Sequence, residues 1–162
     1  IWNPEFPVAE QHIARLAGWR RSFCMRSIHH RGTVSAPGLV LALDEDVGAA
    51  CDGVAFRVAE GAEAETLAQL RERELISSAY LERWVTLDLG GQRQAALVFV
   101  IDPDHAQYCG DLPLEEQAQI IARAHGGKGA NRDYLFSTAE HLAALGIDDA
   151  DLSWLAARVR GL

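Results

Sequence analysis

The chain has 162 residues, of which 49% are hydrophobic and 23% are charged, and its formal net charge is -8. This length suits one domain that buries roughly two thirds of its unfolded surface. The acidic balance argues against non-specific nucleic-acid binding, which needs a basic face. The longest apolar run, residues 95–101, is too short to cross a bilayer, so no membrane partner is expected. Three cysteines without metal-ligand spacing indicate reduced thiols and a cytoplasmic protein.

The first half of the chain predicts β-strands separated by polar turns. The expected strands cover residues 13–26, 39–43, 50–58, 84–89 and 94–101. In the first strand, Trp19, Phe23 and Met25 share one face. An acidic turn at residues 44–48 joins the second strand to the third, and Gly90 and Gly91 form a hairpin turn between the last two. The last strand is apolar on both faces, which places it at the centre of the sheet.

Helices dominate the second half. One helix is expected earlier, at about residues 63–75, between the two groups of strands. Asp111 is expected to cap the next helix, whose apolar stripe ends at His125, and Asn131 the one after it. A last short helix covers residues 149–160. The predicted fold is a single α+β domain, residues 1–162, with a mixed, barrel-like sheet and packed helices.

Glu74 is the first candidate for a chemical role. Leu67, Leu70 and Glu74 follow the i, i+3, i+7 spacing of one helix face, whereas Glu72 falls on the other side. A carboxylate beside leucines loses water, which makes it a better base near neutral pH. The alternative is a structural ion pair with a neighbouring arginine.

A second candidate follows the first long strand, where His29, His30, Arg31 and Gly32 form a basic turn. The Arg31 guanidinium could bind a carboxylate through two hydrogen bonds, or the turn could be an ordinary basic surface loop. Adjacent histidines in an extended chain point in opposite directions and rarely bind one ion together. No metal site is therefore expected.

The glycine-rich loop at residues 126–131 leads into the helix that carries Tyr134. Its backbone amides could bind an anion, or the loop could be a flexible connector. Tyr134 could donate a hydrogen bond in a site or serve as a core aromatic. The chain has no nucleophile elbow and no cofactor cradle, which favours a reaction in which the substrate supplies its own nucleophile.

A set of motifs in a fixed order carries a resemblance to a known family. The motifs are Ile-Trp-Asn-Pro at residues 1–4, Gly-Trp at 18–19 with Arg-Ser-Phe at 21–23, His-Arg-Gly-Thr at 30–33, Pro-Gly-Leu-Val at 37–40, Gly-Val-Ala-Phe-Arg at 53–57, Arg-Glu at 73–74 before Tyr80, Tyr108 with Gly-Asp-Leu at 110–112, and Gly-Ala-Asn-Arg-Asp-Tyr-Leu at 129–135. Through them the chain resembles the ChaC-like γ-glutamylcyclotransferases over nearly its whole length. In that family a Tyr-Gly-Ser-Leu loop, which holds the substrate, directly precedes Ile-Trp-Asn-Pro, so the loop and its strand are expected upstream of residue 1.

The resemblance implies a cyclotransferase that cleaves glutathione to 5-oxoproline and cysteinylglycine. It gives Glu74 the role of general base and then acid, with Glu72 as the alternative should the register differ. It also implies substrate contacts from Ile1, Trp2, Arg31 and Tyr134, and no metal or organic cofactor. Two other functions stay open: a cyclotransferase for another γ-glutamyl amine or peptide, and a catalytically silent binding domain. The size and the acidic surface favour a monomer.

Overall fold

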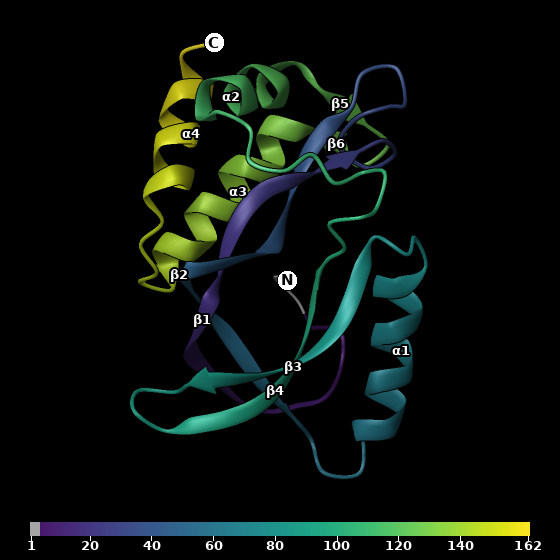
Figure 1. Ribbon diagram of the computed structural model, residues 1–162, viewed down its shortest axis with the longest axis vertical. Coiled ribbons are helices and arrows are strands. Elements are labelled where there is room, and N and C mark those ends of the chain that lie inside the picture. Colours follow the sequence, from purple (N-terminus) through teal and green to yellow (C-terminus); the bar gives the residue numbers. More distant parts are fainter. Residues whose placement is uncertain (1–3) are drawn as a thin grey trace. The chain divides into compact units, whose positions relative to one another are not determined.

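The fold was analysed in a computed structural model that describes residues 4–162 (Figure 1). Its elements follow the expected order of strands first and helices later. They are β1 (Val8–Ser27), β2 (Gly38–Val58), α1 (Glu63–Leu75), β3 (Tyr80–Asp88), β4 (Arg93–Ile101), α2 (Leu114–Arg123), β5 (His125–Gly126), β6 (Gly129–Ala130), α3 (Asn131–Ala144) and α4 (Ala150–Arg160). The α+β class is confirmed. Among residues 4–162, no helix is long and apolar enough to span a membrane.

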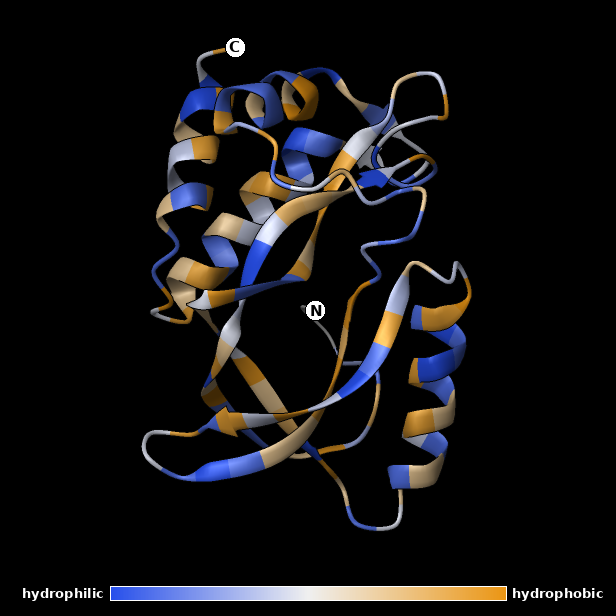
Figure 2. Ribbon diagram, in the orientation of Figure 1, coloured by the Kyte–Doolittle hydropathy of each residue, from blue (hydrophilic) through white to orange (hydrophobic). Residues whose placement is uncertain are grey.

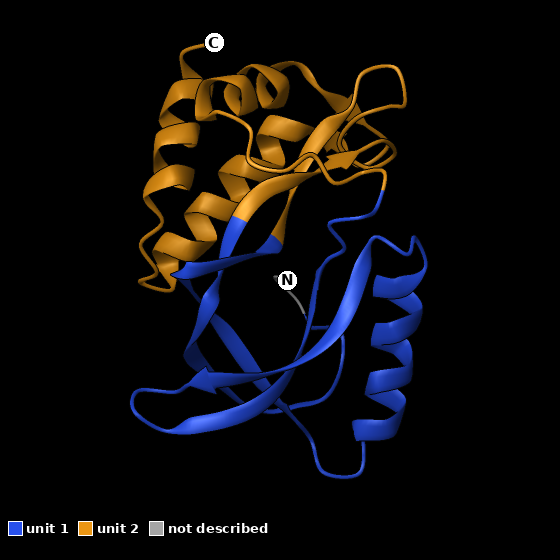
Figure 3. Cartoon of the chain, viewed as in Figure 1, with its two compact units in different colours: residues 1–21, 43–105 blue, residues 22–42, 106–162 orange. Residues whose placement is uncertain are grey.

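The chain divides into two compact units, each built from two separate stretches (Figure 3). Unit 1 combines Ile1–Arg21 with Leu43–His105, and unit 2 combines Ser22–Ala42 with Ala106–Leu162. Strands β1 and β2 each contribute to both units, so neither unit is one continuous stretch of sequence. The expectation of a single domain stays a prediction.

The main sheet has the strand order β2-β1-β3-β4. β3 pairs antiparallel with β4 through the expected hairpin, whose Gly90 and Gly91 have φ angles of 73° and 99°. The central position predicted for β4 is wrong for the part of the chain that the structure describes, where β4 ends the order. Leu97 and Val98 in its apolar run are only partly buried. Hydrophobic residues on both faces of β4 therefore do not indicate a neighbouring strand on each side of it. The barrel-like closure is not confirmed, since the order begins at β2 and ends at β4.

The turn expected at residues 44–48 is also wrong, because β2 continues through these residues. Asp44 is buried, and its Oδ2 accepts a hydrogen bond from Arg20 Nη2 at 3.3 Å. Both residues belong to unit 1. A buried carboxylate needs such a partner, and the partner lies 24 residues away on β1. The acidic residues were therefore part of a strand and not a turn signal.

Gly18 lies between two stretches of β1 that differ in their pattern of buried residues. Its φ is 81°, a left-handed conformation that glycine adopts without strain and that is typical of a β-bulge. Before it, the even-numbered Ala14 and Leu16 are buried with Leu87 in the core of unit 1. After it, Phe23, Cys24 and Met25 are all buried, and Trp19, predicted on the face of Phe23 and Met25, packs instead against the core of unit 1.

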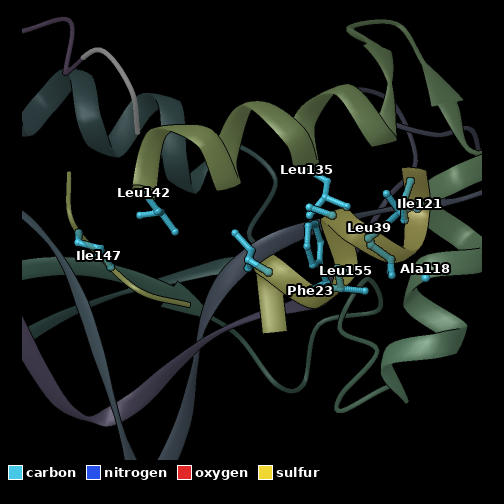
Figure 4. Close-up of a cluster of buried hydrophobic side chains, with 11 residues drawn as sticks. Phe23, Leu39, Ala118, Ile121, Leu135, Leu142, Ile147 and Leu155 are labelled. Atoms are coloured by element: carbon cyan, nitrogen blue, oxygen red, sulfur yellow. The ribbon is translucent and has the colours of Figure 1, made fainter. Parts of the chain in front are cut away.

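The core of unit 2 forms between β1, β2 and helices α2, α3 and α4 (Figure 4). Its largest fully buried apolar side chains are Phe23, Leu39, Ile121, Leu135 and Leu155. Hydrophobic and hydrophilic residues alternate along the helices of this unit (Figure 2), as expected for helices that bury one face. Each fully buried side chain of this size contributes roughly 1.5–3 kcal/mol relative to exposure.

The bounds predicted for the last helix agree with α4 to within one residue, whereas the cap and the end predicted for the first helix of unit 2 do not agree with α2. Asp149 caps α4, and its Oδ1 accepts a hydrogen bond from Leu152 N at 3.0 Å. Asp111 does not cap α2, whose N-cap is Pro113 and has no side-chain cap. His125 is not on the helix either, because α2 ends at Arg123 and His125 is exposed on β5. The predicted apolar stripe therefore extends beyond the residue at which α2 ends.

Candidate functional site

Glu74 lies in the last turn of α1, the helix predicted with the bounds observed. Its side chain is 21% exposed, and Leu67 and Leu70 are half-buried, whereas Glu72 is exposed. The sequence spacing therefore distinguished the sheltered glutamate from its solvated neighbour correctly.

One oxygen of the Glu74 carboxylate is held and the other is open. Oε1 accepts a hydrogen bond from Arg73 Nε at 2.9 Å. Among residues 4–162, Oε2 has no hydrogen-bond partner. Arg71, another candidate ion-pair partner on this helix, instead binds Glu82 on β3 through two hydrogen bonds of 2.6 and 2.7 Å. Glu74 thus keeps a free acceptor while being anchored by one neighbour.

The first described residues of the chain lie against the same helix. Glu5 Oε2 accepts a hydrogen bond from Arg73 Nη1 at 3.3 Å. Phe6 packs edge-on against Phe56 with ring centroids 6.1 Å apart. Residues 4–6 and the helix enclose a pocket of about 100 Å³, lined by Pro4, Glu5, Phe6, Thr66, Gln69, Leu70 and Arg73. Ligand pockets are usually about 300 Å³ or more, so this hollow alone is too small for a tripeptide. The predicted contacts Ile1 and Trp2 lie outside the described residues.

Arg31 belongs to unit 2, and hydrogen bonds to other residues of that unit fix its position. Its backbone N–H donates to Ser27 Oγ at 2.9 Å. Its Nη1 donates to the carbonyls of Lys128 and Ala130 at 2.7 and 3.3 Å. In the described part of the chain, Nε and Nη2 of Arg31 have no acceptor. The guanidinium is therefore fixed at one nitrogen and keeps two donors for another group.

The structure brings Tyr134 and Arg31 together. The guanidinium carbon of Arg31 lies 5.5 Å from the centre of the Tyr134 ring. The Tyr134 hydroxyl accepts a long hydrogen bond from Leu41 N at 3.4 Å, and the ring packs edge-on against Phe23. Glu74 belongs to unit 1, whereas Arg31 and Tyr134 belong to unit 2. The predicted site residues that the structure describes are therefore divided between the two units.

The glycine-rich loop at residues 126–131 is neither an anion cradle nor a loose connector. Gly127 N and Lys128 N donate to the carbonyls of His29 and His30, each at 2.8 Å. Asn131 N donates to a carbonyl at the end of α2. Because these amides already bind the chain's own carbonyls, they do not form an anion site. The loop is the hairpin of β5 and β6, docked on the turn that carries Arg31.

Three glycines allow this docking. A Cβ on Gly32 would lie 2.0 Å from Gly38 N, and one on Gly126 would lie 2.5 Å from Gly32 N. A Cβ on Gly38 would lie 2.2 Å from Arg31 O. All of these neighbours are backbone atoms, which cannot move aside cheaply. The backbones of three segments therefore meet directly beneath Arg31.

Asn131 has a role that the sequence did not reveal. It was expected to cap α3, but the N-cap is Ala130 and Asn131 is fully buried. Its side chain bonds the main chain of Leu39, 92 residues away. An asparagine after a glycine-rich loop predicts a cap equally well, so only the fold identifies this contact.

The sequence indicates Arg73 as a candidate ion-pair partner of Glu74 but does not reveal its second contact, with Glu5. Among residues 4–162, no group of three or more His, Cys, Asp and Glu side chains is placed to hold a metal ion.

Comparison with known proteins agrees with the sequence motifs that indicated the ChaC-like family. The family model described as "ChaC-like protein" matches residues 1–162. The glutathione-specific γ-glutamylcyclotransferase of Escherichia coli is 40% identical over 163 residues, which cover 100% of this chain and 70% of that protein. The γ-glutamylcyclotransferase 2-3 of Arabidopsis thaliana is 34% identical over 99% of this chain and 84% of its own length. A crystal structure of a yeast γ-glutamylcyclotransferase specific to glutathione has the same fold, with a TM-score of 0.84 over 98% of this chain and 90% of that chain, at 22% identity.

Proposed function

The chain belongs to the ChaC-like protein family, and on that premise we propose that it cleaves glutathione to 5-oxoproline and cysteinylglycine. The observation that carries this proposal is the state of Glu74. It is a half-buried carboxylate with one oxygen anchored and one open, and Arg73, which anchors it, also binds Glu5. That arrangement suits a base that takes a proton from a bound substrate.

In the proposed reaction, Glu74 removes a proton from the α-amino group of the γ-glutamyl moiety. The amine nitrogen attacks the γ-carbonyl carbon of the same moiety and closes a five-membered lactam. The bond between that carbon and the cysteine nitrogen then breaks. Glu74 returns the proton to the departing nitrogen, so the products are 5-oxoproline and cysteinylglycine and no water is consumed. The attack is intramolecular, for which effective molarities can reach about 10⁵ M or more.

Arg31 and Tyr134 are proposed to bind the polar end of the substrate. The two unengaged donors of Arg31 match a carboxylate, and the fixed Nη1 limits the side-chain entropy lost on binding. The Arg31 guanidinium lies over the Tyr134 ring, and this contact is proposed to keep the guanidinium in position. Ile1 and Trp2 are proposed as further substrate contacts on the strength of the family motif alone.

The setting proposed for this reaction is the cytoplasm, on the odd count of three cysteines without metal-ligand spacing in the sequence. A monomer that binds neither nucleic acid nor membranes is proposed on the net charge of -8 and the short apolar runs. A cyclotransferase for a different γ-glutamyl amine or peptide, or a silent binding domain, are the alternatives.

The test is to incubate the full-length protein with glutathione and identify the products by mass spectrometry. We expect 5-oxoproline and cysteinylglycine in equal amounts. Glutamate in place of 5-oxoproline would mean hydrolysis and would refute the mechanism. Turnover of other γ-glutamyl amines without turnover of glutathione would favour the first alternative, and no turnover of either would favour the silent domain.

A further inference from the structure

Arg73 has two acidic partners on different segments of unit 1. Its Nε donates to Glu74 Oε1 at 2.9 Å, and its Nη1 donates to Glu5 Oε2 at 3.3 Å. The first contact is unusual, because adjacent residues on a helix point about 100° apart and do not normally face each other. The guanidinium therefore binds both its neighbour Glu74 and the segment before β1.

We propose that Arg73 is a positioning residue for Glu74, which fixes one carboxylate oxygen, leaves the other for the substrate amine, and ties the end of α1 to residues 4–6. This inference rests on the proposed function, since it assigns a role beside the proposed base. Glu74 is close to the C-terminus of α1, and helix ends fray unless something holds them. A base must be held within a fraction of an ångström of its productive position, so an anchor at this place has a use.

The segment that Arg73 reaches is itself held in an uncommon conformation. Glu5 has a φ of 57°, a left-handed backbone that residues other than glycine rarely adopt. Phe6 packs on Phe56, and Ala59 N donates to the carbonyl of Pro7 at 2.9 Å. Such contacts are what a strained residue needs to keep its conformation. Arg73 thus links Glu74 to a segment with a defined position on unit 1.

Arg71 provides a matched control. It lies two residues earlier on the same helix and is also paired, through two hydrogen bonds with Glu82. That bond holds the pKa of Glu82 below its usual range. Because Arg71 does not contact Glu74, Arg71→Met removes a charge and an ion pair from α1 without touching the proposed base.

The experiment compares kcat and KM for glutathione in the wild type, Arg73→Met, Arg73→Lys and Arg71→Met, with the melting temperature of each. We expect Arg73→Met to lower kcat roughly ten- to a hundred-fold with little change in KM, and to melt like Arg71→Met. Arg73→Lys should keep part of the activity, because an ammonium still reaches one carboxylate but lacks the planar fork.

Two results would overturn the assignment. Equal kcat values for Arg73→Met and Arg71→Met would mean that Arg73 does not position the base. A rise in KM at constant kcat would mean that Arg73 contacts the substrate directly. A wild-type protein without 5-oxoproline formation would instead refute the proposed function itself, so the two failures are distinguishable.

Discussion

The Asn131 side chain binds both main-chain groups of Leu39. Its Oδ1 accepts from Leu39 N and its Nδ2 donates to Leu39 O, each at 2.7 Å, and Asn131 has no exposed surface. An amide is the side chain that offers a donor and an acceptor in this geometry. The contact joins the first residue of α3 to the start of β2 within unit 2.

Asn131→Ala is expected to lower the free energy of unfolding by roughly 2–5 kcal/mol, because it leaves two buried main-chain groups without partners. Urea denaturation followed by circular dichroism measures this loss. Arg132→Ala, at the exposed neighbouring position, is the control and should change stability little. Similar midpoints for the two variants would show that the Leu39 contact is not important for stability.

Gly126→Ala should prevent folding, whereas Gly127→Ala should be tolerated. A Cβ on Gly126 would lie 2.5 Å from Gly32 N and 2.6 Å from His30 O. The nearest atom to a Cβ on Gly127 is His29 O at 3.4 Å, an ordinary contact. The soluble yield and the melting temperature of the two variants give the comparison. A stable Gly126→Ala protein would contradict the close approach of these backbones.

The ion pair between Glu115 on α2 and Arg158 on α4 should make stability depend on pH. Two hydrogen bonds from Arg158, at 2.8 and 2.7 Å, are the main reason why the pKa of Glu115 falls from 4.5 to about 2. A lowered folded-state pKa stabilises the fold above the unfolded pKa, and the contribution disappears as the pH falls through the folded value. The melting temperature of Glu115→Gln should therefore lie below that of the wild type at pH 7.

This difference in melting temperature should shrink between about pH 4.5 and pH 2, where Glu115 becomes protonated in the wild type. Because both side chains are largely exposed, the difference should be small and should weaken in high salt. A gap that stays constant down to pH 2 would argue against the ion pair as its cause.

Arg31→Lys should raise KM for glutathione more than it lowers kcat, because the guanidinium is proposed to bind the substrate carboxylate and not the reacting atoms. A rise of roughly ten-fold corresponds to the loss of one charge-assisted hydrogen bond. Arg132→Lys, on the exposed side of α3, is the control. An unchanged KM in Arg31→Lys would remove Arg31 from the substrate site.

The sequence predicted features that depend on neighbouring residues. Glu74 and Glu72 were separated correctly because α1 is one regular helix, whose spacing decides which side chain is sheltered. The hairpin at Gly90 and Gly91 is likewise local.

The features that were missed depend on distant partners. The acidic run in β2 is not a turn, because Arg20 neutralises Asp44 from another strand. Asn131 is not a cap, because Leu39 lies 92 residues away in sequence and takes its side chain. The apolar pattern of β4 could not reveal that, within residues 4–162, only β3 pairs with it in the sheet order. Pattern and propensity contain no information on such pairings.

The central claim, that Glu74 is the base of a glutathione cyclotransferase, is tested most directly by comparing Glu74→Gln with Glu72→Gln. Both changes remove one charge from the same turn of α1, and only Glu74 is sheltered. We predict that kcat/KM for 5-oxoproline formation falls roughly 10²- to 10⁴-fold in Glu74→Gln and stays unchanged in Glu72→Gln, with both proteins folded. Equal activity of the two variants, or the larger loss in Glu72→Gln, would contradict the account.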